Sequence, residues 1–369
     1  MRVCCADCGR SQDFSAEEWR CVCGGAWEPA HRACFDPKKI DSRTHSIWRY
    51  GAFLGLDIKE EYIPMGVGWT PLVPVDYGGK RINLKLEYLS PSGSFKDRGV
   101  NAMVSQLKHM GVRSVIEDSS GNAGASLAAH AARFGLNAQI FVPAYASPAK
   151  KHQIGIYGAE VIAIEGPRKA AEEAAQAAVK HEQAYASHAY HPAYLAGQIT
   201  AAYELWEQLG RKIPDWILLP VAQGGQFLGY WFGFRDIFRA GFSERMPRLV
   251  AVQAERVAPI YHAWRKSLDT IPEMIDPEPT VAEGIAITKP VRGKRLLQVL
   301  RETNGCVIAV NDSEVLEAQQ KLGYQGYYVE PTSAVAFAGL EKLKQELSEE
   351  DVVILILTGN GLKGEPQKV

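Results

Sequence analysis

The run Ser92–Gly99 is the first segment whose residue types are suited to chemistry, because it places Lys96 between a predicted strand and a predicted helix. A lysine in the first turn of a helix faces the positive end of the helix dipole, which disfavours its ammonium form. If the side chain is also partly desolvated, the pKa of the amine falls and the amine becomes a usable nucleophile. The alternative interpretation is an ordinary solvated loop lysine.

The second segment, residues 119–126, reads Ser-Ser-Gly-Asn-Ala-Gly-Ala-Ser and also lies between a predicted strand and a predicted helix. Small residues let backbone N–H groups approach an anion at a helix start, and the Asn122 amide can both donate and accept hydrogen bonds. An ordinary helix N-cap is the competing interpretation. The candidate binding residues of this loop are Ser119, Ser120, Gly121, Asn122 and Ala123.

Two further turns follow predicted strands and offer complementary groups. The turn Pro220–Gln226 favours backbone donors around a phosphate at a helix start, although its spacing matches neither a dinucleotide fingerprint nor a Walker loop. Its candidate residues are Gln223, Gly224, Gly225 and Gln226. Thr358, at the end of the last strong strand, supplies a hydroxyl. Taken singly each is a weak signal, but the four segments together supply an amine, an anion loop, a phosphate loop and a hydroxyl.

Short apolar runs alternate with helical stretches from residue 82 onward, and this alternation predicts an α/β fold with parallel sheets. The predicted strands are Ile82–Leu86, Ser114–Glu117, Gln139–Pro143, Val161–Glu165, Trp216–Pro220, Arg248–Gln253, Val307–Val310 and Val352–Thr358. The predicted helices include Asp97–Met110, Ala123–Phe134, Lys169–Gln183, Ala196–Leu209, Ser313–Leu322 and Ser333–Leu347. Ligands in such folds bind beyond the carboxyl ends of the strands, so we expect the four chemical segments to meet there.

Composition excludes several classes of function. The 369 residues amount to about 2.5 units of typical domain size, which predicts two or three packing units. Lys and Arg total 41 against 42 Asp and Glu, so there is no basic excess for nucleic-acid binding. The first residues lack the apolar core of a signal peptide, and no apolar run is long enough to span a bilayer. We therefore expect a cytoplasmic protein without nucleic-acid or membrane partners.

Together these segments resemble the threonine synthase-like family, within the fold-type-II group of pyridoxal-phosphate enzymes. The resemblance extends from Trp69 to Lys363 and rests on the motifs at 69–72, 85–87, 94–99, 119–122, 282–285, 330–334 and 358–361. It implies an α/β fold like that of the tryptophan synthase β subunit, with two α/β domains and parallel-rich sheets. The large pyridoxal-phosphate domain would comprise residues 41–95 and 205–369, and a small domain, residues 96–204, would carry the Asn122 loop.

The resemblance also implies roles for the candidate residues. Lys96 would hold pyridoxal 5'-phosphate as a Schiff base and then act as the base at the substrate Cα. Asn122 would bind the ring hydroxyl, Thr358 would face the pyridine nitrogen, and the turn 223–226 would bind the phosphate. The loop 119–123 would receive the carboxylate of an amino-acid substrate. The family resemblance further implies a homodimer.

One segment departs from the family pattern. Threonine synthases usually carry Asn-Ser-x-Asn-Pro-x-Arg followed by Gly-Gln-Lys-Thr, and the Ser and Arg bind the phosphate of phosphohomoserine. Here the Arg position holds Tyr194, the Ser position Ala189, the second Asn position His191 and the Lys position Ile199. Since a phosphorylated leaving group needs charge-assisted donors, we expect a different substrate, unless Lys150, Lys151 or Arg168 substitutes. His191 and Tyr194 become substrate-side candidates, or alternatively ordinary packed residues.

The resulting hypothesis is a lyase or synthase that catalyses α,β-elimination or β/γ-replacement on a non-phosphorylated amino acid. A true threonine synthase, which converts O-phosphohomoserine to threonine and phosphate, is one alternative. A non-catalytic protein that binds the cofactor and an amino acid is another, although the complete set of Lys96, Asn122 and Thr358 argues against it.

Six of the seven cysteines lie within the first 34 residues, which indicates thiols or a metal rather than disulfides in this setting. Cys5, Cys8, Cys21 and Cys23 resemble the small zinc ribbon at the N-terminus of many threonine synthases, and residues 1–40 would form this ribbon-like segment. The second pair has one intervening residue where two are usual, and Cys4 and Cys34 are alternative ligands. A structural zinc site and a metal-free remnant of one both remain open.

Overall fold

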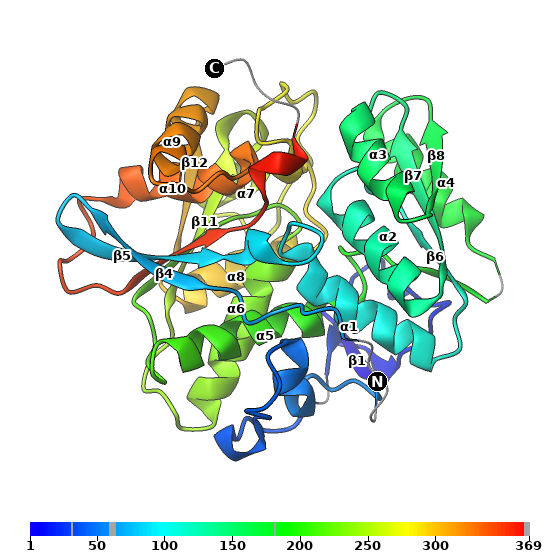
Figure 1. The fold of residues 1–369 in the computed structure, drawn as a ribbon, viewed down its shortest axis with the longest axis horizontal. Coiled ribbons are helices and arrows are strands. Elements are labelled where there is room, and N and C mark those ends of the chain that lie inside the picture. Colours follow the sequence, from blue (N-terminus) through cyan, green and yellow to red (C-terminus); the bar gives the residue numbers. More distant parts are fainter. Residues whose placement is uncertain (31, 59–63, 181, 365–369) are drawn as a thin grey trace.

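Two sheets organise the computed structural model, which describes residues 1–30, 32–58, 64–180 and 182–364 (Figure 1). The larger sheet has the strand order β12-β11-β10-β13-β5-β4 and is parallel except for the edge strand β4, which pairs antiparallel with β5. Its strands are β4 (Leu72–Tyr77), β5 (Lys80–Leu86), β10 (Trp216–Pro220), β11 (Arg248–Ala254), β12 (Cys306–Val310) and β13 (Val353–Leu357). Parallel pairing requires long crossover connections, and helices supply them.

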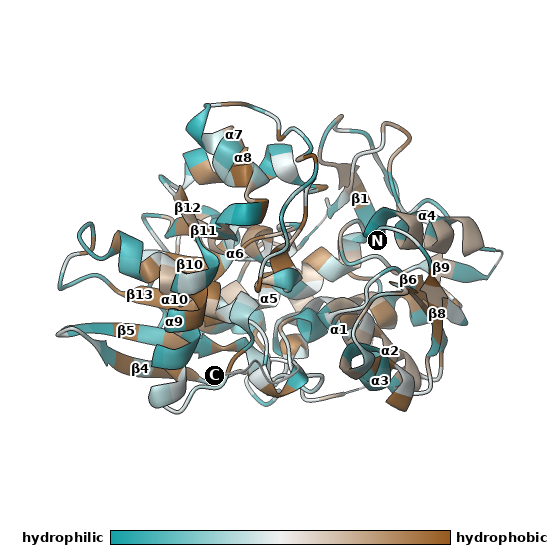
Figure 2. Cartoon of the chain, turned by 90° about the horizontal axis from the view of Figure 1, so that it is seen from above, coloured by the Kyte–Doolittle hydropathy of each residue, from teal (hydrophilic) through white to brown (hydrophobic). Residues whose placement is uncertain are grey.

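Successive residues of these strands contribute to different hydrophobic clusters, because side chains alternate between the faces of a sheet. Ile217 and Leu219 of β10 pack in a cluster with one group of helices, and Leu218 packs in a cluster with another. The first group is α5 (Pro192–Gln208), α6 (Gly225–Arg239), α7 (Pro259–Arg265) and α8 (Gly293–Glu302), and the second is α9 (Asp312–Tyr324) and α10 (Pro331–Leu343). Helices thus cover both faces of this sheet, and Figure 2 shows hydrophilic colour on α9 of the second group.

The smaller sheet has the order β8-β7-β6-β9 and is parallel throughout. Its strands are β6 (Ser114–Glu117), β7 (Asn137–Pro143), β8 (Glu160–Ile164) and β9 (Gln183–Tyr185), and its helices are α1 (Lys96–His109), α2 (Asn122–Phe134), α3 (Pro148–Ile156) and α4 (Arg168–Ala178). Helices α1 and α2 share one hydrophobic cluster with this sheet, and α4 shares another. All four strands lie within 96–204, while the domain boundaries themselves stay predictions.

A buried cluster of charges lies where β5, α1 and α5 meet. Arg98 donates to Glu87 at 2.7 Å and to Glu204 at 2.8 Å, and Lys85 forms an ion pair with Glu204. The side chains of these four residues are fully buried, and Thr70 adds a hydroxyl that donates to Glu87 at 2.9 Å. The motifs at 69–72, 85–87 and 94–99 therefore supply a polar core that holds α1 in place.

The amino-terminal residues form a small antiparallel sheet of the order β2-β1-β3. Its strands are β1 (Arg2–Cys5), β2 (Ser11–Asp13) and β3 (Trp27–Pro29). This segment packs against the rest of the chain: Trp19 makes an edge contact with Tyr185 of β9, and the Arg292 guanidinium donates to the carbonyl oxygen of Trp27 at 2.9 Å.

Each predicted strand and helix is present; the strands Ser114–Glu117 and Trp216–Pro220 have the predicted ends, and the others differ by one to five residues at one or both ends. The largest difference is the predicted helix Lys169–Gln183, which ends at Ala178, because Gln183 begins β9 and pairs with Ser114 of β6. Residue 181 of that helix lies outside the described residues. The pattern implied a helix start at the turn 220–226, where α6 begins, but gave that helix no bounds, because its glycines and aromatic residues weaken the helical signal. The segments α3, α7, α8, β4, β9 and the ribbon strands were not among those named from the sequence. In the described part of the chain, no helix is long and apolar enough to cross a membrane.

Candidate active site

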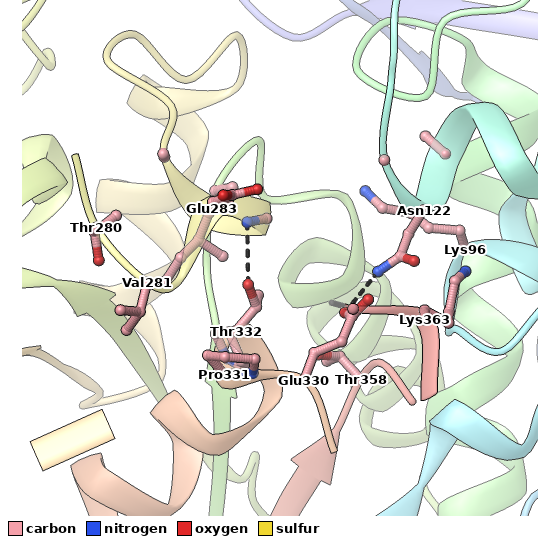
Figure 3. A pocket seen from close by; sticks show the side chains of 18 of the residues that line it. Lys96, Asn122, Thr280, Val281, Glu283, Glu330, Pro331, Thr332, Thr358 and Lys363 are labelled. Carbon is pink, nitrogen blue, oxygen red and sulfur yellow. Dashed lines mark hydrogen bonds between the residues drawn. The ribbon is translucent and has the colours of Figure 1, made fainter. Parts of the chain in front are cut away.

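A cavity of about 1500 Å³ lies beyond the carboxyl ends of the strands and brings together segments from both sheets (Figure 3). Twelve residues proposed from the sequence line it: Lys96, Ser119, Ser120, Gly121, Asn122, Ala123, Tyr194, Gln223, Gly224, Gly225, Gln226 and Thr358. Lys150 and Arg168, two of the three possible substitutes for the missing basic residues, also line it, whereas Lys151 is not among the lining residues and donates to the Ala144 carbonyl oxygen at 2.7 Å. Further polar side chains on the wall are Asp118, Gln153, His188, Glu283, Glu330 and Lys363. The four chemical segments therefore converge on one cavity.

Lys96 begins α1 and lies beside the end of β13. The Phe95 N–H donates to the Thr358 carbonyl at 3.0 Å, and Ser94 forms a bridge with Gly359, so the lysine is held next to Thr358. Within the described residues the Lys96 amine has no hydrogen bond or ion pair, and it lies 4.8 Å from the centre of the Phe95 ring. Burial lowers the pKa of this amine to about 8. A partly neutral, unpaired amine is the form that attacks an electrophilic carbon.

The loop 119–123 leads into α2 and is shaped by close backbone contacts. A Cβ at Gly124 would collide with the Ser119 carbonyl oxygen, so the first turn of α2 requires glycine there. Asn122 donates from Nδ2 to Glu330 Oε2 at 2.8 Å, as Figure 3 shows. Burial raises the pKa of the Glu330 carboxyl, and the neighbouring Lys363 opposes that shift. The loop presents backbone donors and the Asn122 amide to the same part of the cavity as Lys96.

The turn before α6 fits a phosphate group. Gly224 has φ +87°, and a Cβ there would lie 2.6 Å from Leu296 Cδ2, so glycine is required on both grounds. Gln226 is 4% exposed, yet both atoms of its amide lack a partner within the described residues. A buried amide without partners at the start of a 15-residue helix matches an anionic ligand. The Gln223 side chain itself accepts from the Val291 N–H at 2.9 Å.

The two substrate-side candidates differ in position. Tyr194 lines the cavity at 2% exposure, and its hydroxyl has no partner within the described residues. His191 is not among the cavity residues: its Nδ1 accepts from the Ala193 N–H at 3.2 Å and caps α5, and its ring contacts Phe14. His188 lines the cavity in its place. Sequence spacing could not distinguish these two histidines, because the turn formed by residues 187–191 decides which one faces the cavity.

Two acidic residues at the end of β6 were missed. Glu117 Oε1 lies 3.2 Å from His188 Nδ1, and burial raises the pKa of this carboxyl to about 7. Asp118 accepts from the Tyr185 hydroxyl at 2.6 Å and lies 3.5 Å from Arg168. The available signal was a pair of adjacent acidic residues, the last residue of β6 and the one after it, directly before the anion loop.

The basic groups of the cavity wall are matched by carboxylates. Lys150 forms an ion pair with Glu283, and Arg168 lies near Asp118. Lys363 donates to the Ser92 carbonyl at 2.8 Å. Burial lowers the pKa of the Lys363 amine, and the nearby Glu330 carboxylate raises it again in part. A strongly anionic ligand group near this wall would compete with these carboxylates for the basic side chains.

Four cysteines converge in the amino-terminal segment. The sulfurs of Cys5, Cys8, Cys21 and Cys23 all lie within 4.8 Å of one another. The arrangement is compatible with four thiolate ligands around one tetrahedral ion, and the single residue between Cys21 and Cys23 does not prevent it. Cys4 lies outside this group and contacts the Gly9 carbonyl oxygen at 3.4 Å.

Comparisons with known proteins agree with this architecture. Residues 63–359 match the family described as pyridoxal-phosphate dependent enzyme. The chain is 32% identical over 373 residues to the threonine synthase of Methanocaldococcus jannaschii, covering 97% of this chain and 92% of that protein. It is 36% identical over 322 residues to the threonine synthase of Synechocystis sp., covering 85% and 82%.

Among solved structures, the T.th. threonine deaminase matches with a TM-score of 0.68 at 27% identity, covering 80% of this chain and 94% of that one. The predicted fold-type-II α/β architecture is therefore confirmed. With a family match over most of its length and relatives above 30% identity, the chain belongs to the pyridoxal-phosphate-dependent enzymes, in the threonine synthase-like group.

Proposed function

We propose that this chain catalyses α,β-elimination or β/γ-replacement on a non-phosphorylated amino acid, with pyridoxal phosphate bound at Lys96. The observation that carries the proposal is the buried Lys96 amine, which has no partner in the described structure, in a cavity that also offers an anion loop and a phosphate turn. No nucleic-acid or membrane surface enters this proposal.

The cavity residues would hold the cofactor from three sides. Gly224, Gly225 and the unpaired Gln226 amide would bind the phosphate, and Lys96 would hold the reactive carbon. Asn122 would contact the ring hydroxyl and Thr358 the ring nitrogen. Pyridoxal phosphate, when bound, withdraws electrons from the bonds to the substrate Cα.

The chain's own residues would orient the substrate and transfer its protons. Backbone N–H groups of the loop 119–123 would bind the substrate carboxylate, which fixes the Cα–H bond relative to Lys96. The Lys96 amine would then accept the Cα proton, a task that suits a pKa of about 8. A hydroxyl partner such as Thr358 leaves the ring nitrogen largely unprotonated, and this favours elimination and replacement.

The charges of the cavity favour a leaving group other than phosphate. Lys150 and Arg168 lie near Glu283 and Asp118, so neither is an uncompensated cation. Tyr194 stands at the position where threonine synthases carry the phosphate-binding Arg, and it offers a neutral hydroxyl. A dianionic leaving group would compete with Glu283 and Asp118 for these two basic residues.

A substrate panel tests the proposal. We expect the purified holoenzyme to release a keto acid or a replacement product from serine, threonine, O-acetylserine or diaminopropionate. O-phosphohomoserine and phosphoserine should have a kcat/KM at least about 100-fold lower, because the site has Tyr194 where a bidentate Arg would bind their phosphate. Robust formation of threonine and phosphate from O-phosphohomoserine would contradict the proposal.

Threonine synthase activity is the second candidate. It is favoured by the identity to two threonine synthases and by the presence of Lys150 and Arg168 on the cavity wall. If the panel selects O-phosphohomoserine, Arg168→Gln should raise KM for this substrate more than it lowers kcat, since the lost contact is to a non-reacting phosphate. A protein that only binds the cofactor and an amino acid would show spectral changes without turnover of any panel member.

We also propose that the four clustered cysteines bind one structural zinc ion. Purified protein is expected to contain close to one zinc per chain, and Cys21→Ser should lower that content severely, because a structural site needs all four ligands. Cys34→Ser is the matched control and should retain the metal, because Cys34 lies outside the cluster. Metal analysis that finds no zinc in folded wild-type protein would support a metal-free remnant instead.

A further inference from the structure

A histidine and a carboxylate form a pair in the cavity that the roles described above leave unused. The ring Nδ1 of His188 lies 3.2 Å from Glu117 Oε1, and the backbone N–H of His188 donates to Glu117 Oε2 at 3.2 Å. Both side chains are buried, and His188 lines the cavity that contains Lys96. The two residues come from elements 71 positions apart in the chain.

The pair is oriented so that one ring nitrogen remains available. Glu117 occupies Nδ1, whereas His188 Nε2 makes no hydrogen bond within the described residues. The ring also meets the Tyr194 ring edge-on, with 6.1 Å between the centroids, and the buried Tyr194 hydroxyl has no partner in the described structure either. Two polar groups with free hydrogen-bonding capacity therefore lie together on the cavity wall, which indicates a polar ligand atom between or beside them.

The backbone around His188 is firmly supported. The N–H groups of Tyr190 and His191 donate to the Ser187 carbonyl at 3.3 and 3.0 Å. The buried Arg292 guanidinium donates to the carbonyl oxygens of Ala189 and Tyr190, both at 3.2 Å, and links them to β3 of the amino-terminal sheet. A base that is oriented by a carboxylate on a fixed turn has the arrangement of a general acid or base.

We propose that His188 donates a proton from Nε2 to the leaving oxygen of the substrate side chain, and that Glu117 positions His188 and resupplies the proton. The inference rests on the proposed function and names its substrate class: an amino acid whose β-hydroxyl is an uncharged, poor leaving group. Such a group must be protonated as it departs, whereas a phosphate departs as a stable anion.

The proton transfers balance in the elimination. The Cα proton passes to the Lys96 amine, and the electron pair of the Cα–H bond forms the Cα–Cβ double bond. The Cβ–O bond breaks, and its electron pair stays on oxygen. The Nε2 proton of His188 moves to that oxygen and gives water, while the proton of the Glu117 carboxyl moves to Nδ1. Before the reaction Glu117 is a protonated carboxyl and His188 carries its proton on Nε2. After it Glu117 is a carboxylate and His188 carries its proton on Nδ1. One proton from Lys96 or water then restores the starting state.

Two substrates that share a skeleton and differ only in their leaving group test this role. Pyruvate release is measured from L-serine, which needs the proton, and from β-chloro-L-alanine, whose chloride departs without one. With L-serine, His188→Asn is expected to lower kcat about 10²- to 10⁴-fold, the usual contribution of a general acid. With β-chloro-L-alanine the loss should stay below about threefold.

Glu117→Gln should show the same selective loss at a smaller size, and it provides a second variant with an isosteric side chain. His152→Asn is the matched control, since His152 is exposed on α3 and does not line the cavity; it should leave both rates unchanged. Bound-cofactor absorbance confirms that each variant is folded.

Equal losses with both substrates, or no loss with L-serine, would overturn the assignment of His188. A wild-type enzyme that uses β-chloro-L-alanine but no hydroxy amino acid would overturn the substrate class while the lyase function stands. If wild type processes neither substrate nor any other amino acid, the proposed function itself fails.

Discussion

Lys96→Ala is expected to abolish turnover and to remove the visible absorbance of the bound cofactor. Lys96 is the lysine that begins α1 in the cavity, and its amine is unpaired within the described residues, with a pKa lowered to about 8 by burial. Alanine removes both the attachment point and the base at Cα, so we expect kcat to fall by at least about 10⁴-fold. Absorbance spectra and single-turnover kinetics measure the two losses independently.

Lys108→Ala is the matched control, because this lysine lies on the last turn of the same helix and is exposed. Among the described residues it donates only to the Phe134 carbonyl oxygen, at 2.6 Å. It should retain the cofactor absorbance and near-normal turnover. Turnover that survives in Lys96→Ala at a rate close to wild type would show that another amine performs the chemistry.

Glu204→Gln is expected to have the largest effect on stability. Glu204 accepts from Arg98 at 2.8 Å, pairs with Lys85, and accepts the N–H groups of Trp69 and Thr70 at 2.7 and 2.9 Å. The amide would leave two fully buried cations with Glu87 as their remaining carboxylate. Removing one partner of a buried ion pair typically costs about 3–5 kcal/mol of unfolding free energy, which urea denaturation at neutral pH measures.

Asp269→Asn breaks the ion pair with Arg301 at 2.9 Å and is the control. Asp269 is 87% exposed there, so the cost should stay below about 1 kcal/mol. Equal destabilisation by the two substitutions would contradict the assigned role of the buried cluster.

The pH dependence of the Glu204 effect follows from its ionisation. Burial alone would raise the pKa of this carboxyl, but Arg98 and Lys85 outweigh burial and hold it well below its usual range. A depressed folded-state pKa contributes stability above the unfolded value of about 4.3 and loses it as the pH falls further. The difference between wild type and Glu204→Gln should therefore be constant near neutral pH and shrink in acid.

Much of the cofactor side of the site could be predicted from local sequence. Lys96, the loop 119–123 and the turn 223–226 each follow a strand and begin a helix, and Thr358 ends a strand, so their positions depend on neighbours within a few residues. Because the carboxyl ends of parallel strands lie at one edge of a sheet, the pattern predicted where each segment lies in its own sheet. The packing of the two sheets then brings the loop 119–123 of the smaller sheet to the same cavity as the segments of the larger sheet. The cavity contains all of these residues.

The substrate side could not be predicted in the same way. Whether His188 or His191 faces the cavity depends on the turn at 187–191, and the partner of His188 comes from β6. Likewise, Asn122 meets Glu330 across 208 residues. Such pairs depend on how α5 and the two sheets pack, and no short-range pattern encodes that packing.

The buried ion pairs that stabilise the fold also depend on segments that are remote in the chain. The motif residues Lys85, Glu87 and Arg98 have sequence neighbours that suggest catalysis, yet in the fold Lys85 and Arg98 pair with Glu204 of α5, and Glu87 pairs with Arg98. The sequence by itself determined the order of strands and helices, the loops at the strand ends and the lysine among them, because these depend on local periodicity and turn chemistry. Only the tertiary structure decided which charges pair, which histidine reaches the cavity and which basic residues are neutralised, because these depend on distances between segments remote in the chain.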